Sequence, residues 1–307
     1  MFSEIGNVGS CFGFSVRSGL PFSLLRDGPG TPLEIDEADS EPDSLGTLVR
    51  EWGGRAGETL TTRLYAGPGR DRFWLDRVGT FEIDSAKPAI AVPRLSDRFT
   101  NAIWRESIMW GTPAAVCAVR RGLVSVHAAS VEVEGRAVLL SAPGTYGKTT
   151  LSAAFHAAGF RLLSDDMVTL RLAPAPALFP GPAILRLRRD VHENLAFTDI
   201  AAVHKFGRKV GLVLDHRRRG GAEPVPLAAI VLLRKGMDEV SLRRVAPTSA
   251  LRDLFALSLK AVIDPQRSFD DLAQLVTQVP VWDLERPLAY DSLPEVVEKI
   301  VATCLRW

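Results

Sequence analysis

The sequence predicts an α/β domain preceded by a smaller β-rich module. From about residue 123 onward, strand patterns alternate with helix patterns, and a glycine-bearing loop joins one strand directly to a helix, as at the start of an α/β unit. The preceding part instead holds short apolar alternations separated by turn residues. At 307 residues, the chain is about twice as long as a typical domain, which agrees with two parts.

The composition is that of a folded protein without a polyanionic partner. Apolar residues make up 46% and charged residues 24%, and 37 basic against 36 acidic residues leave a net charge of +1. No apolar stretch approaches the roughly 20 residues that span a bilayer, and no secretory signal opens the sequence. The three cysteines lack the spacing of a zinc or redox motif. We therefore expect a cytoplasmic protein with reduced cysteines and no nucleic-acid or membrane partner.

The β-rich module is expected over residues 1–95. Residues 11–16 show the alternation of a strand, and residues 72–75 with residues 80–83 predict a hairpin. The acidic segment at residues 36–43 predicts an exposed loop that leads into a short helix near residues 45–52.

Two helices are expected to join this module to the rest of the chain. Ser96 suits the N-cap of a helix that runs up to Gly111, and a second helix is predicted from Pro113 to Arg120, with Gly122 ending it. We assign both helices to a second domain that covers residues 96–307.

The second domain opens with two predicted strands, residues 124–133 and 137–141, which are joined by a tight turn. A helix at residues 148–158 and a strand at residues 161–164 follow the glycine-bearing loop. The later elements are predicted to be strands at residues 167–172, 185–189, 210–214 and 281–284, a hairpin of residues 227–233 with residues 239–245, and helices at residues 249–259, 268–279 and 293–304.

The glycine-bearing loop matches most of a phosphate-binding template. That template is Gly, four residues, Gly, Lys and Ser or Thr between a strand and a helix, and here Ala142 replaces the first glycine. Such a loop turns backbone N–H groups toward an anion at the positive end of the helix. The alternative is an ordinary strand-to-helix turn with a surface lysine. The residues predicted to bind a nucleotide are Pro143, Gly144, Thr145, Tyr146, Gly147, Lys148, Thr149 and Thr150.

Paired carboxylates, Asp165 and Asp166, follow an apolar strand shortly after the loop. Phosphoryl transfer needs one carboxylate near a metal ion and one near the incoming hydroxyl. Adjacent side chains on a regular strand point to opposite faces, so both can serve one site only where the strand stops or twists. The alternative is one structural aspartate with a solvated neighbour. His127, inside an apolar strand, is on its own more typical of a core residue than of a catalytic one.

Three segments together resemble the kinase domain of bacterial HPr kinase/phosphorylase and its relatives. They are residues 125–130, 142–150 and 159–166, and a looser resemblance extends through residues 281–284 and the final helix. The relatives include stand-alone serine kinases, some of which serve gene clusters that make modified peptides such as lasso peptides. The resemblance implies a phosphate-loop kinase fold related to phosphoenolpyruvate carboxykinase, the cofactors ATP and Mg²⁺, and a homo-oligomer as one candidate assembly.

The same resemblance implies roles for individual residues. Lys148 and the loop amides would bind the triphosphate, and Thr149 with Asp165 would hold Mg²⁺. Asp166 would accept the proton of the attacking serine hydroxyl, and His127 would lie beside Asp166 to tune or orient it. The division of roles between Asp165 and Asp166 is left open.

The sequence also departs from the bifunctional members of that family. Tyr146 is a bulky residue in the loop, and no glycine- and arginine-rich signature follows the aspartates, which argues against phosphorylase activity and against HPr as the substrate. We therefore expect an ATP- and Mg²⁺-dependent serine kinase that acts on a peptide or small protein, with a ribosomally made precursor peptide as one candidate. Two alternatives stay open: a nucleotide- or peptide-binding module that has lost catalysis, and a small-molecule kinase.

Basic residues after the aspartates are candidates for contact with the γ-phosphate, where phosphoryl transfer needs a further cation. We choose Lys205, Arg208 and Lys209, against the alternative of a solvated loop. The basic residues at 217–219 are expected to be solvated, with a clamp for an acidic substrate as the alternative.

Overall fold

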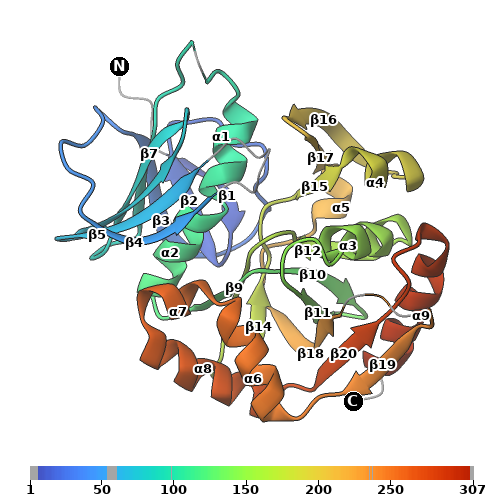
Figure 1. Cartoon of the computed structure of the whole chain (residues 1–307). Helices are drawn as coiled ribbons and strands as arrows, with labels where there is room; N and C mark the ends of the chain where they lie inside the picture. Colours follow the sequence, from blue (N-terminus) through green and yellow to red (C-terminus); the bar gives the residue numbers. More distant parts are fainter. Residues whose placement is uncertain (1–5, 54–60, 98, 235, 237, 305–307) are drawn as a thin grey trace.

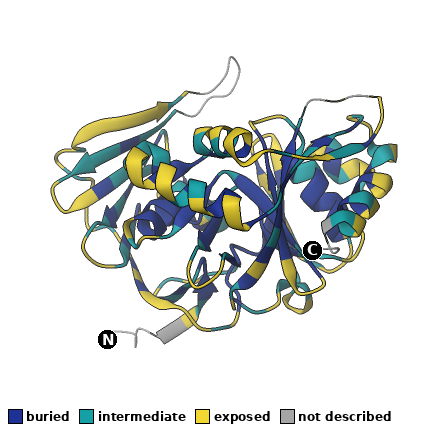
Figure 2. Cartoon of the chain, turned by 90° about the horizontal axis from the view of Figure 1, so that it is seen from below, coloured by how far each residue is buried: buried dark blue, intermediate teal, exposed yellow. Residues whose placement is uncertain are grey.

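The computed structural model describes residues 6–53, 61–97, 99–234, 236 and 238–304. Three sheets with covering helices make up this part of the chain, so the mixed α/β class expected from the sequence is confirmed (Figure 1). Buried residues concentrate in the strands and on the inner sides of the helices, whereas exposed residues follow the outer surfaces (Figure 2). No helix of the described residues is long and apolar enough to cross a membrane.

The first sheet is built from the N-terminal part of the described chain. Its strands are β1 (Gly6–Cys11), β2 (Phe14–Ser18), β3 (Thr31–Glu37), β4 (Thr47–Trp52), β5 (Thr62–Gly67), β6 (Arg70–Leu75), β7 (Gly79–Asp84) and β8 (Ala89–Val92). They lie in the order β1-β2-β3-β8-β7-β6-β5-β4, and β3 is parallel to both of its neighbours. Alternate residues such as Leu33 and Ile35 of β3 are buried, so one face of this sheet packs on a core.

Two sequence predictions for this sheet are wrong and one is confirmed. Residues 11–16 are not a single strand, because Phe12 and Gly13 both take a positive φ in the tight turn between β1 and β2. Residues 47–52 form strand β4 rather than a helix, since pairing with β5 at the sheet edge outweighs the local helix preference. The predicted hairpin is present as β6 and β7.

Two helices, α1 (Ala102–Met109) and α2 (Thr112–Arg120), follow this sheet. α1 begins after Asn101, whose side chain accepts a hydrogen bond from the Trp104 N–H, and not after Ser96 as predicted. The backbone of Ser96 instead exchanges two hydrogen bonds with Phe99, which holds this segment outside the helix. α2 runs as predicted and contacts β6, β7 and β8.

The second sheet carries the glycine-bearing loop. Its strands are β9 (Val124–Val126), β10 (Ala128–Val133), β11 (Arg136–Ser141), β12 (Arg161–Ser164), β13 (Val168–Arg171), β14 (Ala177–Phe179), β18 (Val225–Leu233), β19 (Ser241–Arg244) and β20 (Val281–Glu285). The main path is β12-β10-β11-β18-β14-β13-β9, and β20 pairs with β18 and β19. β11, β18 and β20 are parallel to one another, so their carboxyl ends meet at one edge of the sheet.

Helices cover both faces of this second sheet. They are α3 (Lys148–Ala157), α6 (Pro247–Ala256), α7 (Leu259–Ile263), α8 (Pro265–Gln278) and α9 (Leu293–Cys304), with the short 3-10 turn η1 (Tyr290–Ser292) before α9. Val138 and Leu140 of β11 belong to the core beneath α3 and α9, whereas Leu139 belongs to the core beneath α6 and α8. The alternation of side chains along a strand thus fills two cores from one strand.

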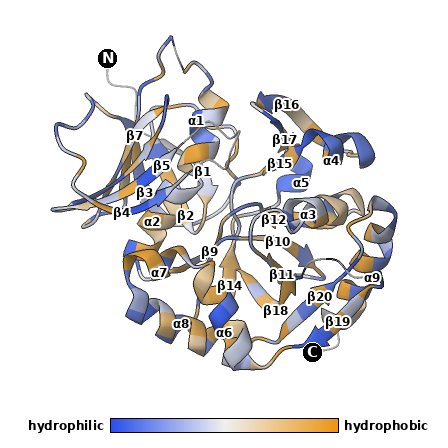
Figure 3. Cartoon of the chain, in the orientation of Figure 1, coloured by the Kyte–Doolittle hydropathy of each residue, from blue (hydrophilic) through white to orange (hydrophobic). Residues whose placement is uncertain are grey.

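A third, three-stranded sheet contacts α3 through β15. It is built from β15 (Ile184–Arg188), β17 (Lys209–Leu214) and β16 (Ile200–Phe206), in that order. Two short helices accompany it, α4 (Arg189–Asn194) and α5 (His216–Arg219), and both are strongly hydrophilic (Figure 3).

Two predictions for the second part of the chain are wrong. Residues 124–133 are not one strand, because the chain breaks at His127 and divides into β9 and β10. Residues 227–233 and 239–245 do not pair as a hairpin, since β20 lies between β18 and β19. This insertion gives β20 a strand partner on each side, and strand pairs made from distant segments leave no local signal in the sequence.

Candidate active site

The glycine-bearing loop connects the end of β11 to the start of α3. Gly147 stands at the N-cap of α3 with a φ of 83°, and no side chain of the described residues caps the helix. A left-handed φ of this size favours glycine, which explains the residue at this position. The N–H groups of the first helical turn have no partners within the helix, so they are available to an anion.

Ala142, which replaces the first glycine of the template, fits the loop without disturbing it. Its side chain is buried in the core beneath α3, and its carbonyl oxygen accepts a hydrogen bond of 2.7 Å from Lys148 Nζ. The Lys148 amine also lies 3.4 Å from the carbonyl oxygen of Pro143. Burial lowers the pKa of Lys148, whereas the charges of Asp166 and Asp165 oppose this shift.

The other loop residues divide between solvent and core. Tyr146 packs against the core beneath α3, so its bulk turns inward. Thr150 in the first turn of α3 is half-buried. The exposed residues of the loop are Pro143, Gly144 and Thr145.

Asp165 lies beside the loop, at the end of β12. Its Oδ1 accepts a hydrogen bond of 3.0 Å from the Thr149 hydroxyl, and its Oδ2 accepts one of 3.1 Å from the Arg186 N–H. The residue is only 5% exposed, and burial raises its pKa despite the opposing charge of Arg186. The carboxylate and the hydroxyl together form a pair of oxygen ligands at the start of α3.

Asp166 faces the same site because the strand stops before it. β12 ends at Ser164, and Asp166 has a φ of 82°, which removes the opposite-face geometry of a regular strand. Its carboxylate forms an ion pair with the guanidinium of Arg186 on β15. Burial raises the pKa of Asp166, but the charge of Arg186, followed by those of His127 and Lys209, outweighs burial and lowers the pKa strongly. With 39% of its side chain exposed, the ionised carboxylate is within reach of a substrate.

His127 lies next to Asp166 because both residues occupy gaps between consecutive strands: His127 lies between β9 and β10, and Asp166 lies between β12 and β13. β10 pairs with β12 and β9 pairs with β13, so the break at His127 lies opposite the break after Ser164. His127 Nδ1 lies 2.8 Å from the carbonyl oxygen of Asp166 and 3.4 Å from its Oδ1. Because these oxygens only accept, Nδ1 carries the proton. Burial lowers the pKa of His127, and the negative charge of Asp166 opposes this shift.

The structure therefore brings His127, Lys148, Thr149, Asp165 and Asp166 to one edge of the second sheet. The three candidate cations Lys205, Arg208 and Lys209 are exposed on the β16–β17 hairpin. Of these, Lys209 influences the site, since its charge lowers the pKa of both Asp166 and Lys148.

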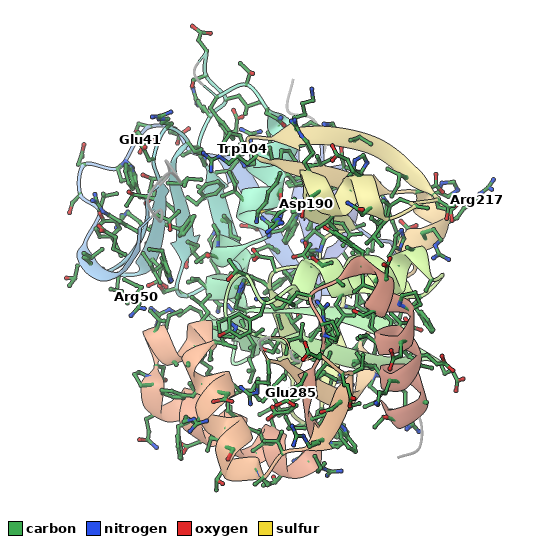
Figure 4. The ribbon with its side chains drawn as sticks, turned by 45° about the vertical axis from the view of Figure 1, so that its right-hand side comes forward. Glu41, Arg50, Trp104, Asp190, Arg217 and Glu285 are labelled. Atoms are coloured by element: carbon green, nitrogen blue, oxygen red, sulfur yellow. The ribbon has the colours of Figure 1, made fainter. Side chains whose placement is uncertain are left out.

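Among the described residues, no hydrogen bond or ion pair joins the basic residues at 217–219 to this cluster. Arg217 is exposed and points away from the molecule (Figure 4). Arg219 instead has a structural role, because its Nη1 donates a hydrogen bond of 3.2 Å to the carbonyl oxygen of Leu25.

Sequence reasoning missed two arginines at this site. Arg186 lies in the strand predicted at residues 185–189 but received no role, although it contacts both aspartates. Arg286 received no role, although its guanidinium lies against Gly147. The signal that could have found Arg286 is its place directly after the strand predicted at residues 281–284, which runs parallel to β18 and through it to the strand before the loop.

Comparisons with known proteins give a likeness to solved structures. No family model and no curated protein matches the sequence. Among solved structures, the Hpr(Ser) kinase/phosphatase from Coxiella burnetii is similar to this chain at 13% sequence identity. The superposition has a TM-score of 0.33 and covers 59% of this chain and 97% of that chain.

Proposed function

We propose that this protein is an ATP- and Mg²⁺-dependent serine kinase. The proposal rests on one observation: two carboxylates with different partners, Asp165 and Asp166, lie together at one phosphate-type loop. Asp165 is bonded to Thr149 of the loop, and Asp166 is held by Arg186 and His127. Phosphoryl transfer requires this division between a metal-binding carboxylate and one that faces the acceptor.

The residues at the loop fit a nucleotide and a magnesium ion. The N-terminus of α3 has no side-chain cap among the described residues, which suits phosphate oxygens. Thr149 and Asp165 would hold Mg²⁺, which prefers oxygen ligands and takes the remainder from water and phosphate. The described residues contain no cluster of three His, Cys, Asp or Glu side chains for a metal, so the ion would depend on the nucleotide. When bound, Mg²⁺ supplies neutralisation of phosphate charge.

Asp166 is the group that would take the proton from the acceptor hydroxyl. Its lowered pKa keeps it ionised at neutral pH, and contacts from two sides fix its position. Arg186 and His127 hold the carboxylate and its backbone carbonyl, so they act as positioning residues. Such placement of a base is worth about 100- to 10,000-fold in rate.

The acceptor that we propose is a serine of a peptide or small protein. This choice rests on the resemblance of residues 125–130, 142–150 and 159–166 to serine kinases. A ribosomally made precursor peptide is one candidate for this acceptor. In this proposal residues 96–307 form the catalytic domain and residues 1–95 form an accessory module.

The test of this function is the variant Lys148→Ala. We expect ATP turnover to be lost and binding of Mg²⁺–ATP in calorimetry to weaken, because the lysine supplies positive charge to the phosphates. The circular dichroism spectrum should stay unchanged, since the Lys148 amine bonds only to loop carbonyls among the described residues.

The matched control is Lys87→Ala, which removes an exposed lysine of the first sheet that pairs with Glu34. It should leave both binding and turnover unchanged. ATP turnover that survives in Lys148→Ala would overturn the assignment of the loop. Tight ATP binding by the wild-type protein, without product after long incubation, would instead favour a binding module.

A further inference from the structure

Arg286 stands at the same sheet edge as the phosphate-type loop. It directly follows β20, whose last residue, Glu285, is labelled in Figure 4. β20 is parallel to β18, and β18 is parallel to β11, the strand before the loop. The carboxyl ends of parallel strands meet at one edge, where open α/β sheets bind their ligands.

The guanidinium of Arg286 is buried without an acidic partner in the described part of the chain. The residue is 3% exposed, and its Nε has no hydrogen-bond partner among the described residues. Nη1 donates a hydrogen bond of 3.1 Å to the carbonyl oxygen of Pro287. Burial lowers the pKa of Arg286, because nothing nearby compensates for the lost hydration of the cation.

The guanidinium approaches the loop at its last glycine. A Cβ placed on Gly147 would lie 2.5 Å from Arg286 Nη2, so a side chain at residue 147 would have to displace the end of this arginine. The positive φ of Gly147 favours glycine, and the lack of a side chain leaves room for the approach of this arginine. Lys148, the next residue, bonds to loop carbonyls, and Arg186 is paired with Asp166.

We propose that Arg286 is a phosphate-binding residue that takes the outer phosphates of a nucleoside di- or triphosphate held by the loop. A buried cation is costly unless it is paired, and phosphate oxygens would supply both the negative charge and the acceptors that the guanidinium lacks. The planar fork of arginine suits phosphate better than the point charge of lysine. This inference rests on the proposed function and adds a residue to its binding site.

The test compares nucleotide binding by Arg286→Gln with binding by the wild-type protein, measured by calorimetry with Mg²⁺. We expect the affinity for ATP and for ADP to fall about 10-fold or more, since a charge-assisted hydrogen bond is lost. Without nucleotide, the variant should unfold at the same temperature as the wild-type protein or at a higher one, because it removes an uncompensated buried charge. Arg286→Lys should lose affinity as well, because it keeps the charge but not the fork.

Arg243→Gln is the matched control, because Arg243 lies on β19 beside β20 and its side chain is 69% exposed. It should change neither binding nor unfolding temperature. Unaltered ATP affinity in Arg286→Gln, or a large fall in its unfolding temperature without nucleotide, would overturn the role of Arg286. If Lys148→Ala loses ATP while Arg286→Gln keeps it, only this inference fails. A wild-type protein that binds no ATP would overturn the proposed function together with it.

Discussion

Two buried arginines show how differently this molecule treats a desolvated charge in two regions. Arg26 lies at the junction where the loop after β2 meets the strands of the second sheet, and Arg286 lies beside the phosphate-type loop. Both are almost fully buried, at 1% and 3% exposure, and burial lowers the pKa of both, that of Arg26 to about 9. The surroundings of the two guanidiniums are opposite.

Arg26 is saturated by backbone carbonyl groups. Its Nε donates a hydrogen bond of 2.7 Å to Gly181, and its Nη2 donates bonds of 3.0 and 3.1 Å to Leu162 and Leu163. Nη1 donates to the carbonyl oxygen of Arg219. Arg286 has one such bond and an unpartnered Nε within the described chain. A saturated buried cation holds a fold together, whereas an unsaturated one at a sheet edge indicates a place for an anion.

The largest expected effect is on stability, at the junction. Arg26→Met should lower the free energy of unfolding by about 3 kcal/mol or more, because several buried carbonyl groups lose their donors together. Chemical denaturation measures this loss. Arg17→Gln, an exposed position on β2, is the control and should change the free energy by less than about 0.5 kcal/mol. Equal stability of Arg26→Met and the wild-type protein would remove the distinction between the two arginines.

The next effect falls on catalysis, at the site. Asp166→Asn should lower ATP turnover about 100-fold or more, because an amide cannot take the proton of the acceptor. Its effect on stability should be smaller than that of Arg26→Met, since 39% of the Asp166 side chain is exposed. Steady-state kinetics and thermal unfolding of the same samples separate the two quantities.

Asp190→Asn provides a control for this variant. Asp190 is partly exposed and pairs with Arg188 at the start of α4. The variant Asp190→Asn therefore also removes an aspartate–arginine ion pair. Turnover should stay close to that of the wild-type protein. If Asp190→Asn lowers turnover as much as Asp166→Asn, loss of an ion pair near β15 explains both and the assignment of Asp166 as the base is wrong.

The same contrast explains how much of the site could be predicted from the sequence. The loop, the helix after it and the two aspartates lie within one short segment, so their order and spacing are visible in the sequence. The sequence also predicts that the strand must stop or twist near Asp166 if both aspartates serve one site, because adjacent side chains on a regular strand point to opposite faces. The contacts of Arg186 and Arg286 were missed, because they depend on how β15 and β20 lie against residues far away in the sequence.

The fold shows the same limit. The strand–loop–helix unit and the β6–β7 hairpin follow local patterns and were predicted. The strand β4 was mistaken for a helix, because its pairing with β5 decides its conformation. The break at His127 was missed as well, since the residues on either side are apolar and form β strands with different partners. Neither pairing leaves a local signal.

The smallest expected effect concerns Glu106, a buried acid of α1 that contacts the loop after β2. Its carboxylate accepts hydrogen bonds of 2.8 Å from the backbone N–H groups of Ser23 and Leu24. Burial raises the pKa of Glu106 from 4.5 to about 7, against these bonds and the charge of Arg219. The folded protein therefore holds this proton more tightly than the unfolded chain does.

Because the pKa of Glu106 is higher in the folded protein than in the unfolded chain, its contribution to stability is fully present below about pH 4.5. This contribution is lost as the pH rises through about 7. The expected loss across this window is about 1 to 3 kcal/mol. Denaturation at a series of pH values should show a steeper decline for the wild-type protein than for Glu106→Gln, whose amide does not titrate. Subtracting the two curves isolates Glu106 from the other groups of the protein. Parallel curves would mean that water reaches this carboxylate, and that Glu106 is not buried in the way that distinguishes Arg26 and Arg286 from surface groups.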